Sequence, residues 1–295
     1  MKFAIIGYGN LGKSLEAEIE NGKKHELVAI YSRRNIAHKK FRTFASIGDA
    51  NDFDAALLAL GSYNDIGTRA ERFAAFDTVD SFDAHARISD YKKLMQNVKP
   101  NKISIVSAGW DPGLLSIARG AFKIGCASAV TIWGEGISQG HSNAIRSIRG
   151  VLDAVQFTVP KAGYEHLLNA NVTESTELHD RVCYVSCVES DKEDVERAIK
   201  SMPDYFEGYD TQVIFVTQKE VRDLKKRTSH RGLVRCNGDG FTAETLVRMN
   251  SNAAFTAKIM LTYAEAIPKL KNDGFCGALD VFDIPLRYVA DCKLI

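Results

Sequence analysis

The strongest constraint on the fold is a glycine motif near the start of the chain. An apolar run at residues 3–6 leads directly into the motif GYGNLG at residues 7–12. A helical pattern follows, with apolar residues at four-residue spacing as far as Ile19, and a second apolar run covers residues 27–32. A strand, a GxGxxG motif, a helix and a strand in this order form the βαβ unit that binds dinucleotides. We therefore expect an α/β chain that opens with a nucleotide-binding domain.

Each glycine of the motif has a physical role in such a unit. Gly7 permits the tight turn after the strand, Gly9 lets a pyrophosphate approach the backbone, and Gly12 lets the helix pack closely on the strand. The helix N-terminus then offers free N–H groups and the positive end of its dipole to the phosphates. A glycine-rich turn without a ligand is the alternative, but the position between strand and helix favours a Rossmann dinucleotide-binding domain.

The end of the second strand indicates which cofactor binds. An NAD enzyme usually has an acidic residue here, about 20 residues past the glycines, that binds the ribose hydroxyls. This chain has Ser32, Arg33 and Arg34 instead. Two guanidinium groups can grip a 2′-phosphate through paired hydrogen bonds, whereas the alternative is a pair of surface arginines. The position favours NADP(H) as the cofactor.

Further strands of the same sheet are expected between this unit and residue 117. The apolar pattern predicts three more strands: one at 56–60, a short one that ends near 81–83, and one at 103–106. Helices are predicted at roughly 65–75 and 87–98. In open α/β sheets, ligands bind outside the carboxyl ends of the strands. Ser62, Asp83 and Asp111 each follow one of these strands. We expect them to face one crevice, with both carboxylates near the nicotinamide end of the cofactor.

The overall composition excludes several classes of protein. The chain has 295 residues, a net charge of +1 and no CxxC pair among six cysteines. This length suits two domains, and the near-neutral charge argues against nucleic acid as a partner. No apolar run approaches the roughly 18 residues of a membrane helix, and the N-terminal run is too short for a signal peptide. We expect a cytoplasmic protein without a metal site, whose cysteines are buried free thiols.

The pattern changes after about residue 113 and indicates a second domain. Helical segments at 114–124 and 191–202 and strands at 128–134 and 211–218 occur without a glycine motif. A long helix at about 251–267 should end before Pro268. We expect residues 1–117 to form the dinucleotide-binding domain and residues 118–267 an α+β domain for substrate binding and dimerisation. The tail, residues 268–295, is expected to pack back on the first domain.

Several of these motifs together resemble one enzyme family. They are GYGNLG, YSRR, SFDAH, SAGWDPG, WGEGISQGHSNAIRSIRGV and MPDYF, and they extend from residue 3 to about residue 216, with a weaker match around NSNAAFTA. This set is similar to the meso-diaminopimelate D-dehydrogenases. The resemblance implies oxidative deamination of the D-centre of meso-2,6-diaminopimelate with NADP+. The products are L-2-amino-6-oxopimelate (in equilibrium with tetrahydrodipicolinate) and ammonia, in lysine and cell-wall precursor synthesis, and the family is typically homodimeric.

The motif and the resemblance together name the candidate site residues. The residues expected to contact NADP are Gly7, Tyr8, Gly9, Asn10, Leu11, Gly12, Ser32, Arg33, Arg34, Ser62, Tyr63, Asn64, Asp65, Ile66, Ser81, Phe82, Ser107, Ala108 and Gly109. The residues expected to bind the substrate are Trp133, Gln139, Gly140, Thr158, Arg181, His230 and Asn252. The resemblance places two acids, Asp83 and Asp111, near the reacting centre.

The two acids suit the chemistry of amine oxidation. Either Asp83 or Asp111 can attract the substrate ammonium, and one can accept its proton if burial raises its pKa. The plainer alternatives are an N-cap for Asp83 and an Asx-turn before Pro112 for Asp111. Arg181 can hold a carboxylate with its guanidinium fork, or it can form a surface salt bridge with Asp180.

Two other functions stay open at this point. Phe82 stands where the family commonly has tyrosine, and Thr242 where it has asparagine. These departures leave room for an NADP-dependent dehydrogenase of another D-amino acid. A non-catalytic NADP-binding sensor is the second alternative, and the combination of Asp83, Asp111 and Arg181 argues against it, because a sensor needs no pocket for a dicarboxylate.

Overall fold

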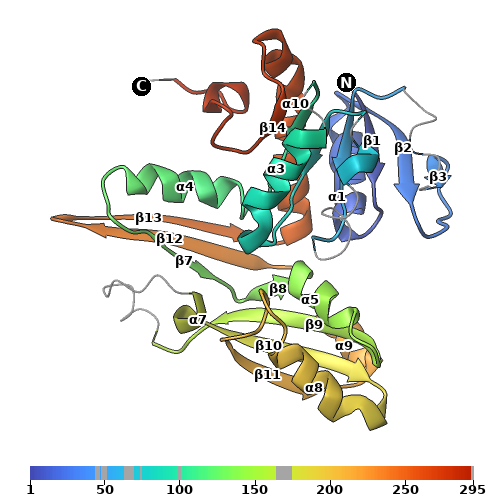
Figure 1. Ribbon diagram of the computed structural model, residues 1–295, viewed down its shortest axis with the longest axis vertical. Helices are drawn as coiled ribbons and strands as arrows, with labels where there is room; N and C mark the ends of the chain where they lie inside the picture. The colour runs from blue at the N-terminus through green and yellow to red at the C-terminus, as the bar shows by residue number, and fades with distance from the viewer. Residues whose placement is uncertain are drawn as a thin grey trace. The chain divides into compact units, whose positions relative to one another are not determined.

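The computed structural model describes residues 1–43, 47, 52–62, 70–73, 75–98, 101–163 and 175–293. The chain divides into two compact units (Figure 1). The first unit contains Met1–Ile117 and Ala253–Ile295, and the second contains Ala118–Asn252. Residues 253–267, which the sequence pattern places in the second domain, therefore belong to the first unit.

A parallel seven-stranded sheet forms the centre of the first unit. Its strand order is β14-β6-β5-β4-β1-β2-β3, and every described pairing is parallel. The strands are β1 (Lys2–Ile6), β2 (Glu26–Ser32), β3 (Phe41–Thr43), β4 (Ala55–Leu58), β5 (Thr78–Asp80), β6 (Ile103–Ile105) and β14 (Gly277–Leu279). This sheet confirms the expected Rossmann-type α/β class.

Helical segments connect and cover these strands. They are α1 (Asn10–Gly22), η2 (Ala70–Phe73), η3 (His85–Arg87), α3 (Ile88–Val98), α10 (Asn252–Asn272) and η5 (Leu286–Tyr288). Helix α4 (Leu114–Lys123) runs from the first unit into the second. Of the helix expected at 65–75, residues 65–69 and 74 lie outside the described part of the chain.

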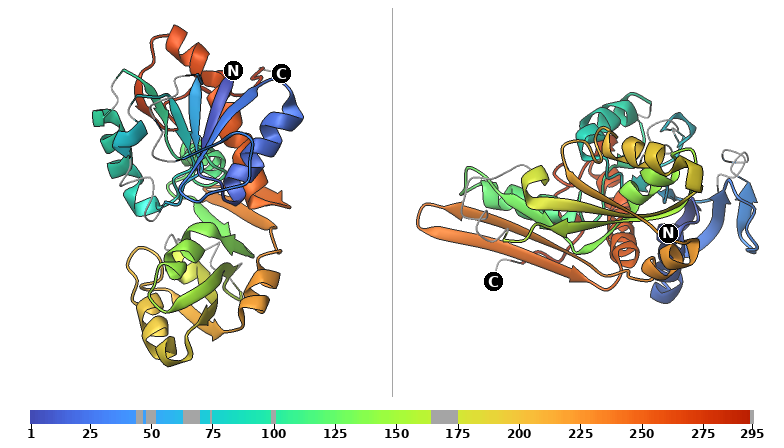
Figure 2. Two further views of the ribbon diagram at one scale, coloured as in Figure 1. Left: turned by 90° about the vertical axis from the view of Figure 1, so that its right-hand side faces the viewer. Right: turned by 90° about the horizontal axis from the view of Figure 1, so that it is seen from below.

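Both faces of this sheet are buried, as is usual for a parallel sheet with helices on each side. Neighbouring residues of a strand point to opposite faces, so each strand contributes to two cores. On β1, Phe3 and Ile5 join a core with the apolar faces of α1 and α10, whereas Ala4 and Ile6 join a second core with Phe73. Figure 2 shows the helices flanking the strands of this unit.

The end predicted for the long helix was wrong. α10 continues through Pro268 as far as Asn272. A proline in a helix interior costs about 3 kcal/mol, because it removes one backbone hydrogen bond and crowds the preceding turn. Ile267 and Leu270 are both buried in the core that α10 shares with the sheet. Their burial, at about 1.5–3 kcal/mol for each side chain, offsets that cost.

The second unit is built on two smaller sheets. A four-stranded sheet has the order β11-β10-β9-β8, and a three-stranded sheet has the order β13-β12-β7. The strands are β7 (Val130–Trp133), β8 (Gly136–Ser138), β9 (Val151–Pro160), β10 (His179–Cys187), β11 (Asp210–Phe215), β12 (His230–Gly238) and β13 (Phe241–Met249). The helical segments are α5 (Gln139–Arg146), α7 (Ser175–Leu178), η4 (Glu189–Asp191), α8 (Lys192–Lys200) and α9 (Gln218–Leu224).

Two cysteines of this unit differ from the expectation of free thiols. Cys126 and Cys236 form a disulfide, with Cα atoms 6.3 Å apart and a separation of 110 positions in the chain. Cys183, Cys187, Cys276 and Cys292 are free. Cys126 follows α4, and Cys236 lies on β12. The tertiary fold brings them together, so no local spacing in the sequence would reveal the pair.

Candidate functional site

The glycine motif has the geometry of a phosphate-binding loop. Gly7 has φ 97°, and a Cβ atom there would lie 2.4 Å from the Ala59 carbonyl oxygen. A Cβ atom at Gly12 would lie 2.3 Å from the Gly7 carbonyl oxygen, so helix and loop touch at this point. At Gly9, in contrast, a Cβ atom would meet nothing within 4 Å. Two glycines are thus required by the fold, whereas Gly9 faces the open space that a pyrophosphate needs.

The loop after β2 presents the two arginines. Ser32 is buried, and its hydroxyl accepts a hydrogen bond of 3.1 Å from the backbone N–H of Arg34. Arg33 and Arg34 are exposed at the carboxyl end of the strand. Their position and charge fit the 2′-phosphate of NADP.

A buried carboxylate joins the loops that follow β5 and β6. Asp80 is fully buried, and its Oδ1 accepts hydrogen bonds of 2.9 Å from the backbone N–H groups of Phe82 and Ser107. Its Oδ2 accepts a hydrogen bond of 2.9 Å from the Tyr91 hydroxyl. Sequence patterns missed Asp80, because a single aspartate at a strand end carries no sign of these distant partners.

Two predicted cofactor contacts look different at these strand ends. Phe82 is almost fully buried and stacks on Tyr91, with ring centroids 4.5 Å apart, which leaves only its backbone for a ligand. Ser107 has φ 57°, and its buried hydroxyl has no hydrogen-bond partner among the described residues. An unpartnered buried hydroxyl normally carries a free-energy penalty, so a polar cofactor fits well beside Ser107.

Asp83 lies in the loop after β5, beside the end of β4. Its backbone N–H donates a hydrogen bond of 3.0 Å to the Ser62 hydroxyl. Burial raises the pKa of Asp83, and the hydrogen bond with Ser62 and the charge of His85 lower it by less. A carboxyl group with a raised pKa can exchange a proton closer to neutral pH than an ordinary aspartate.

Asp111 projects from a closely wound turn. The backbone N–H of Gly109 donates to the Pro112 carbonyl at 3.0 Å, and the Asp111–Pro112 peptide bond is cis. Gly113 has φ 132°, and a Cβ atom there would lie 1.9 Å from the Gly109 carbonyl oxygen. Trp110 is buried. The turn is therefore structurally demanding, and it holds a half-buried carboxylate at the carboxyl end of β6.

One face of the four-stranded sheet in the second unit carries polar side chains among apolar ones. Val155, Phe157 and Val182 pack with α9 on the other face. On the polar face, Arg181 of β10 lies opposite Thr158 of β9, because side chains alternate along each strand. The fold thus brings together two residues that the resemblance assigns to the substrate.

Arg181 is held in an unusual environment. It is 5% exposed, its Nη1 donates a hydrogen bond of 2.6 Å to the Thr158 hydroxyl, and its guanidinium lies 4.0 Å from the centre of the Tyr209 ring. Its Nε atom has no partner, and no carboxylate pairs with it among the described residues. Burial lowers the pKa of Arg181, which means that the buried charge is costly in the absence of an anion.

The other predicted substrate residues lie on several elements. A Cβ atom at Gly136 would meet the His230 ring at 2.2 Å, so His230 covers the position opposite Thr158 on β8. Gln139 and Gly140 open α5, where the N-cap hydroxyl of Ser138 accepts from the backbone N–H of His141. Asn252 begins α10, and its backbone N–H donates to the Thr228 carbonyl at 3.1 Å.

Trp133 is positioned by a histidine that the sequence pattern did not reveal. The Trp133 backbone N–H donates a hydrogen bond of 2.8 Å to Nε2 of His179, and the two rings lie 5.1 Å apart. Nδ1 of His179 lies 3.0 Å from the Ser175 carbonyl oxygen. Burial, opposed in part by the hydrogen bond with Ser175 and assisted by the charge of Arg181, lowers the pKa of His179 to about 4. His179 is therefore neutral and fixes the end of β7 against β10.

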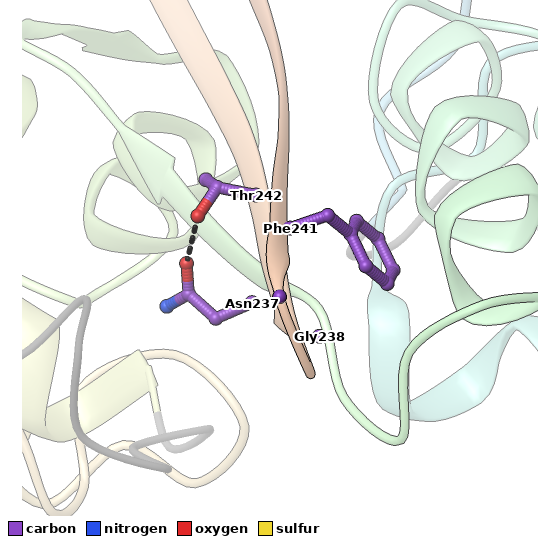
Figure 3. Close-up of a pocket in the computed structure, with 5 residues that line it drawn as sticks. Asn237, Gly238, Phe241 and Thr242 are labelled. Carbon is purple, nitrogen blue, oxygen red and sulfur yellow. Dashed lines mark hydrogen bonds between the residues drawn. The ribbon is translucent and has the colours of Figure 1, made fainter.

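A hollow elsewhere in the second unit is separate from these residues. It has a volume of about 480 Å³ and is lined by Asn237, Gly238, Gly240, Phe241 and Thr242 at the tip of the β12–β13 hairpin (Figure 3). Thr242 donates a hydrogen bond of 3.1 Å to Asn237 there. This tip belongs to the three-stranded sheet, whereas Arg181 belongs to the four-stranded sheet.

Some candidate features fall outside these observations. Tyr63, Asn64, Asp65 and Ile66 lie outside the described residues. Within the described ranges, no group of three or more metal-ligating side chains is arranged around one point. No helix in those ranges is both long and apolar enough to cross a membrane.

The parallel sheet, its glycine loop and the arginines after β2 define an oxidoreductase of the NADP-dependent Rossmann type. The family model of the diaminopimelic acid dehydrogenase C-terminal domain matches residues 109–252. The chain is 38% identical to the meso-diaminopimelate D-dehydrogenase of Acetivibrio thermocellus over 98% of this chain and 94% of the relative. It is 36% identical to that of Corynebacterium glutamicum over 96% and 93%. The chain belongs to the family of meso-diaminopimelate D-dehydrogenases.

Solved structures give the same assignment. The C. glutamicum diaminopimelate dehydrogenase in complex with diaminopimelate matches with a TM-score of 0.91 and 34% identity, over 99% of this chain and 96% of that one. An engineered D-amino acid dehydrogenase bound to NADP+ matches with a TM-score of 0.90 and 32% identity, over 100% and 97%.

Proposed function

We propose that this chain oxidises the D-centre of meso-2,6-diaminopimelate with NADP+. The reaction converts the substrate, NADP+ and water into L-2-amino-6-oxopimelate, NADPH, ammonium and one proton. When bound, NADP+ accepts the hydride from the substrate Cα atom. The cofactor loop and the two acids belong to the first unit, and Arg181 and Thr158 belong to the second unit. Membership of the family and the buried state of Arg181 support this proposal.

The observation that carries the substrate class is the buried guanidinium of Arg181, which pairs with no carboxylate within the described part of the chain. A buried charge without a counter-ion is unfavourable, and proteins normally pair it. Its partners among the described residues are the Thr158 hydroxyl and the Tyr209 side chain, neither of which is anionic. A substrate carboxylate would supply the missing charge. This environment favours an anionic substrate over a neutral one, and it argues against a sensor that binds only NADP.

Thr158 is prepared to assist the same carboxylate. Its hydroxyl oxygen accepts from Nη1 of Arg181 at 2.6 Å and from Nε2 of Gln156 at 3.4 Å. Because a hydroxyl has one proton and two lone pairs, both lone pairs are occupied and the proton is available to a ligand. We infer that Thr158 donates this proton to the carboxylate that Arg181 binds.

Asp83 and Asp111 are proposed to act on the reacting amine. Removal of the hydride from Cα requires that the nitrogen lose a proton as the imine forms, and water then attacks the imine carbon. A carboxylate with a raised pKa, as at Asp83, attracts the ammonium and can accept that proton. Asp111 is proposed to hold the amine or the attacking water.

Assembly and location complete the proposal. We infer a homodimer that acts in the cytoplasm, and the family resemblance supports both statements. A mass of twice 32.6 kDa measured by light scattering, within the range of ordinary assay concentrations, is the expected result for the dimer. A monomer with full activity would contradict it.

A spectrophotometric assay tests the reaction itself. The protein is mixed with NADP+ and meso-diaminopimelate, and NADPH absorbance is followed, with the LL and DD isomers, simple D-amino acids and NAD+ in parallel. We expect NADPH from the meso isomer, far less from the LL isomer, and slower reduction of NAD+. Preferential oxidation of a D-amino acid with one carboxylate would favour the alternative that the engineered D-amino acid dehydrogenase neighbour suggests.

A further inference from the structure

One carboxylate in the first unit contacts both the glycine motif and the loop that begins with Arg33 and Arg34. Glu16, on α1, accepts a hydrogen bond at Oε2 from the hydroxyl of Tyr8, which belongs to the glycine motif. Its Oε1 lies 2.7 Å from Nε2 of His38, in the loop that begins with Arg33 and Arg34. The Glu16 side chain is 13% exposed, so water competes little for these bonds.

The backbone fixes which nitrogen of His38 carries the proton. The N–H of Lys40 donates a hydrogen bond of 3.1 Å to Nδ1 of His38, so Nδ1 must be the acceptor. In the neutral ring the proton is then on Nε2, which donates to Glu16. The Tyr8 hydroxyl keeps its own proton, because burial and the hydrogen bond with Glu16 raise the pKa of Tyr8 to about 12. Glu16 therefore accepts hydrogen bonds from two donors.

The loop between Arg34 and β3 is anchored at both ends. At its start, the N–H of Arg34 donates to the Ser32 hydroxyl. At its end, the N–H of His38 donates to the Ile36 carbonyl at 2.9 Å, and the His38 carbonyl accepts from Phe41 at 3.1 Å. The His38 side chain is the part of this turn that reaches α1. Without the bond to Glu16, the loop would keep its anchors at Ser32 and at the pairing of β2 with β3, but its turn would lose this link to α1.

We propose that Glu16, through His38 and Tyr8, is a positioning residue that sets the preference for NADP over NAD. It holds the arginine loop and the glycine loop in one arrangement, so that the guanidinium groups are already placed for the 2′-phosphate when the pyrophosphate binds. Preorganisation of this kind increases affinity because less loop entropy is lost on binding. This inference rests on the proposed use of NADP, and it concerns residues that are not expected to touch the cofactor's reacting ring.

Calorimetric binding of NADP+ and NAD+, without substrate, tests the proposal. His38→Ala frees the arginine loop alone and should weaken NADP+ about tenfold, the typical effect of one hydrogen bond to a charged group, with less than a twofold change for NAD+. Glu16→Gln replaces one acceptor oxygen with a donor and should weaken NADP+ at least as much. Glu265→Gln is the matched control, because His25 and Glu265 form a similar 2.7 Å pair in the same unit.

The outcomes separate this inference from the proposed function. An unchanged ratio of NADP+ to NAD+ affinity in His38→Ala, with the melting temperature of the wild type, would overturn the positioning role. An equal loss in Glu265→Gln would also overturn it, since the effect would then be one of general stability. A wild type without a preference for NADP+ would overturn this inference together with the cofactor assignment. Tight NADP+ binding without oxidation of meso-diaminopimelate would contradict only the proposed reaction.

Discussion

Replacement of Arg181 by methionine should lower the activity and leave the stability of the fold almost unchanged. Arg181 is 5% exposed and has no carboxylate partner among the described residues. If it binds the substrate carboxylate, the variant loses a charge-assisted hydrogen bond worth about 1.5–3 kcal/mol. This free energy corresponds to a fall in kcat/KM of about 10- to 150-fold.

The stability of the same variant should change little. Methionine retains a long unbranched chain and removes a buried charge, which offsets the loss of the Thr158 hydrogen bond and the contact with Tyr209. We expect a free energy of unfolding within about 1 kcal/mol of the wild type or higher. Breaking a buried ion pair, in contrast, typically costs about 3–5 kcal/mol because it leaves a charge without its partner.

Two measurements on the same preparation check this prediction. Initial rates of NADPH formation over a range of meso-diaminopimelate concentrations give kcat/KM, and urea denaturation gives the free energy of unfolding. Arg197→Met is the control, because Arg197 is 72% exposed in its side chain and pairs with Asp194 on the surface of the same unit. A loss of 3–5 kcal/mol in stability with kcat/KM within twofold of the wild type would refute the reasoning, since Arg181 would then be a structural residue.

Three further substitutions test other parts of the site. Asp83→Asn should abolish most turnover. Because the pKa of Asp83 is raised in the folded protein, the stability that its carboxyl group contributes is lost as pH rises through that pKa. At alkaline pH the variant should therefore resist urea at least as well as the wild type. Gly9→Ala should fold normally, because its Cβ atom would meet nothing within 4 Å, yet it should weaken NADP+ binding more than tenfold. Gly12→Ala should destabilise the fold, because its Cβ atom would lie 2.3 Å from the Gly7 carbonyl oxygen. Asp111→Ala should lose turnover but keep NADP+ affinity within a few fold; a large loss in calorimetry would assign Asp111 to the turn alone.

Local patterns predicted the first half of the fold well. The glycine motif, the apolar strands and the arginines after β2 are signals within short windows, and the physics of a βαβ unit connects them directly. The parallel sheet confirms that prediction. The predicted end of α10 was wrong. The rule that proline ends a helix considers only the backbone, whereas Leu270 lies in a core made by residues far away in the chain.

The site was less accessible from the sequence than the fold. Arg181 and Thr158 face each other only because β9 and β10 pair in one register. Asp80, His179 and the bond between Glu16 and His38 depend on partners that are distant along the chain. Such contacts leave no periodicity or spacing, so the family resemblance indicated the residues around the ligands, and the tertiary structure was needed for those that support them.

In the proposed reaction, a hydride is transferred from the D-centre of meso-diaminopimelate to NADP+. Isotope transfer measures this step directly. Two substrates are compared, one with deuterium on Cα of the D-centre and one with deuterium on Cα of the L-centre, and the NADPH formed is analysed by mass spectrometry. We predict one deuterium in NADPH from the first substrate and none from the second. Deuterium from the L-centre, or no NADPH from either substrate, would contradict the claim.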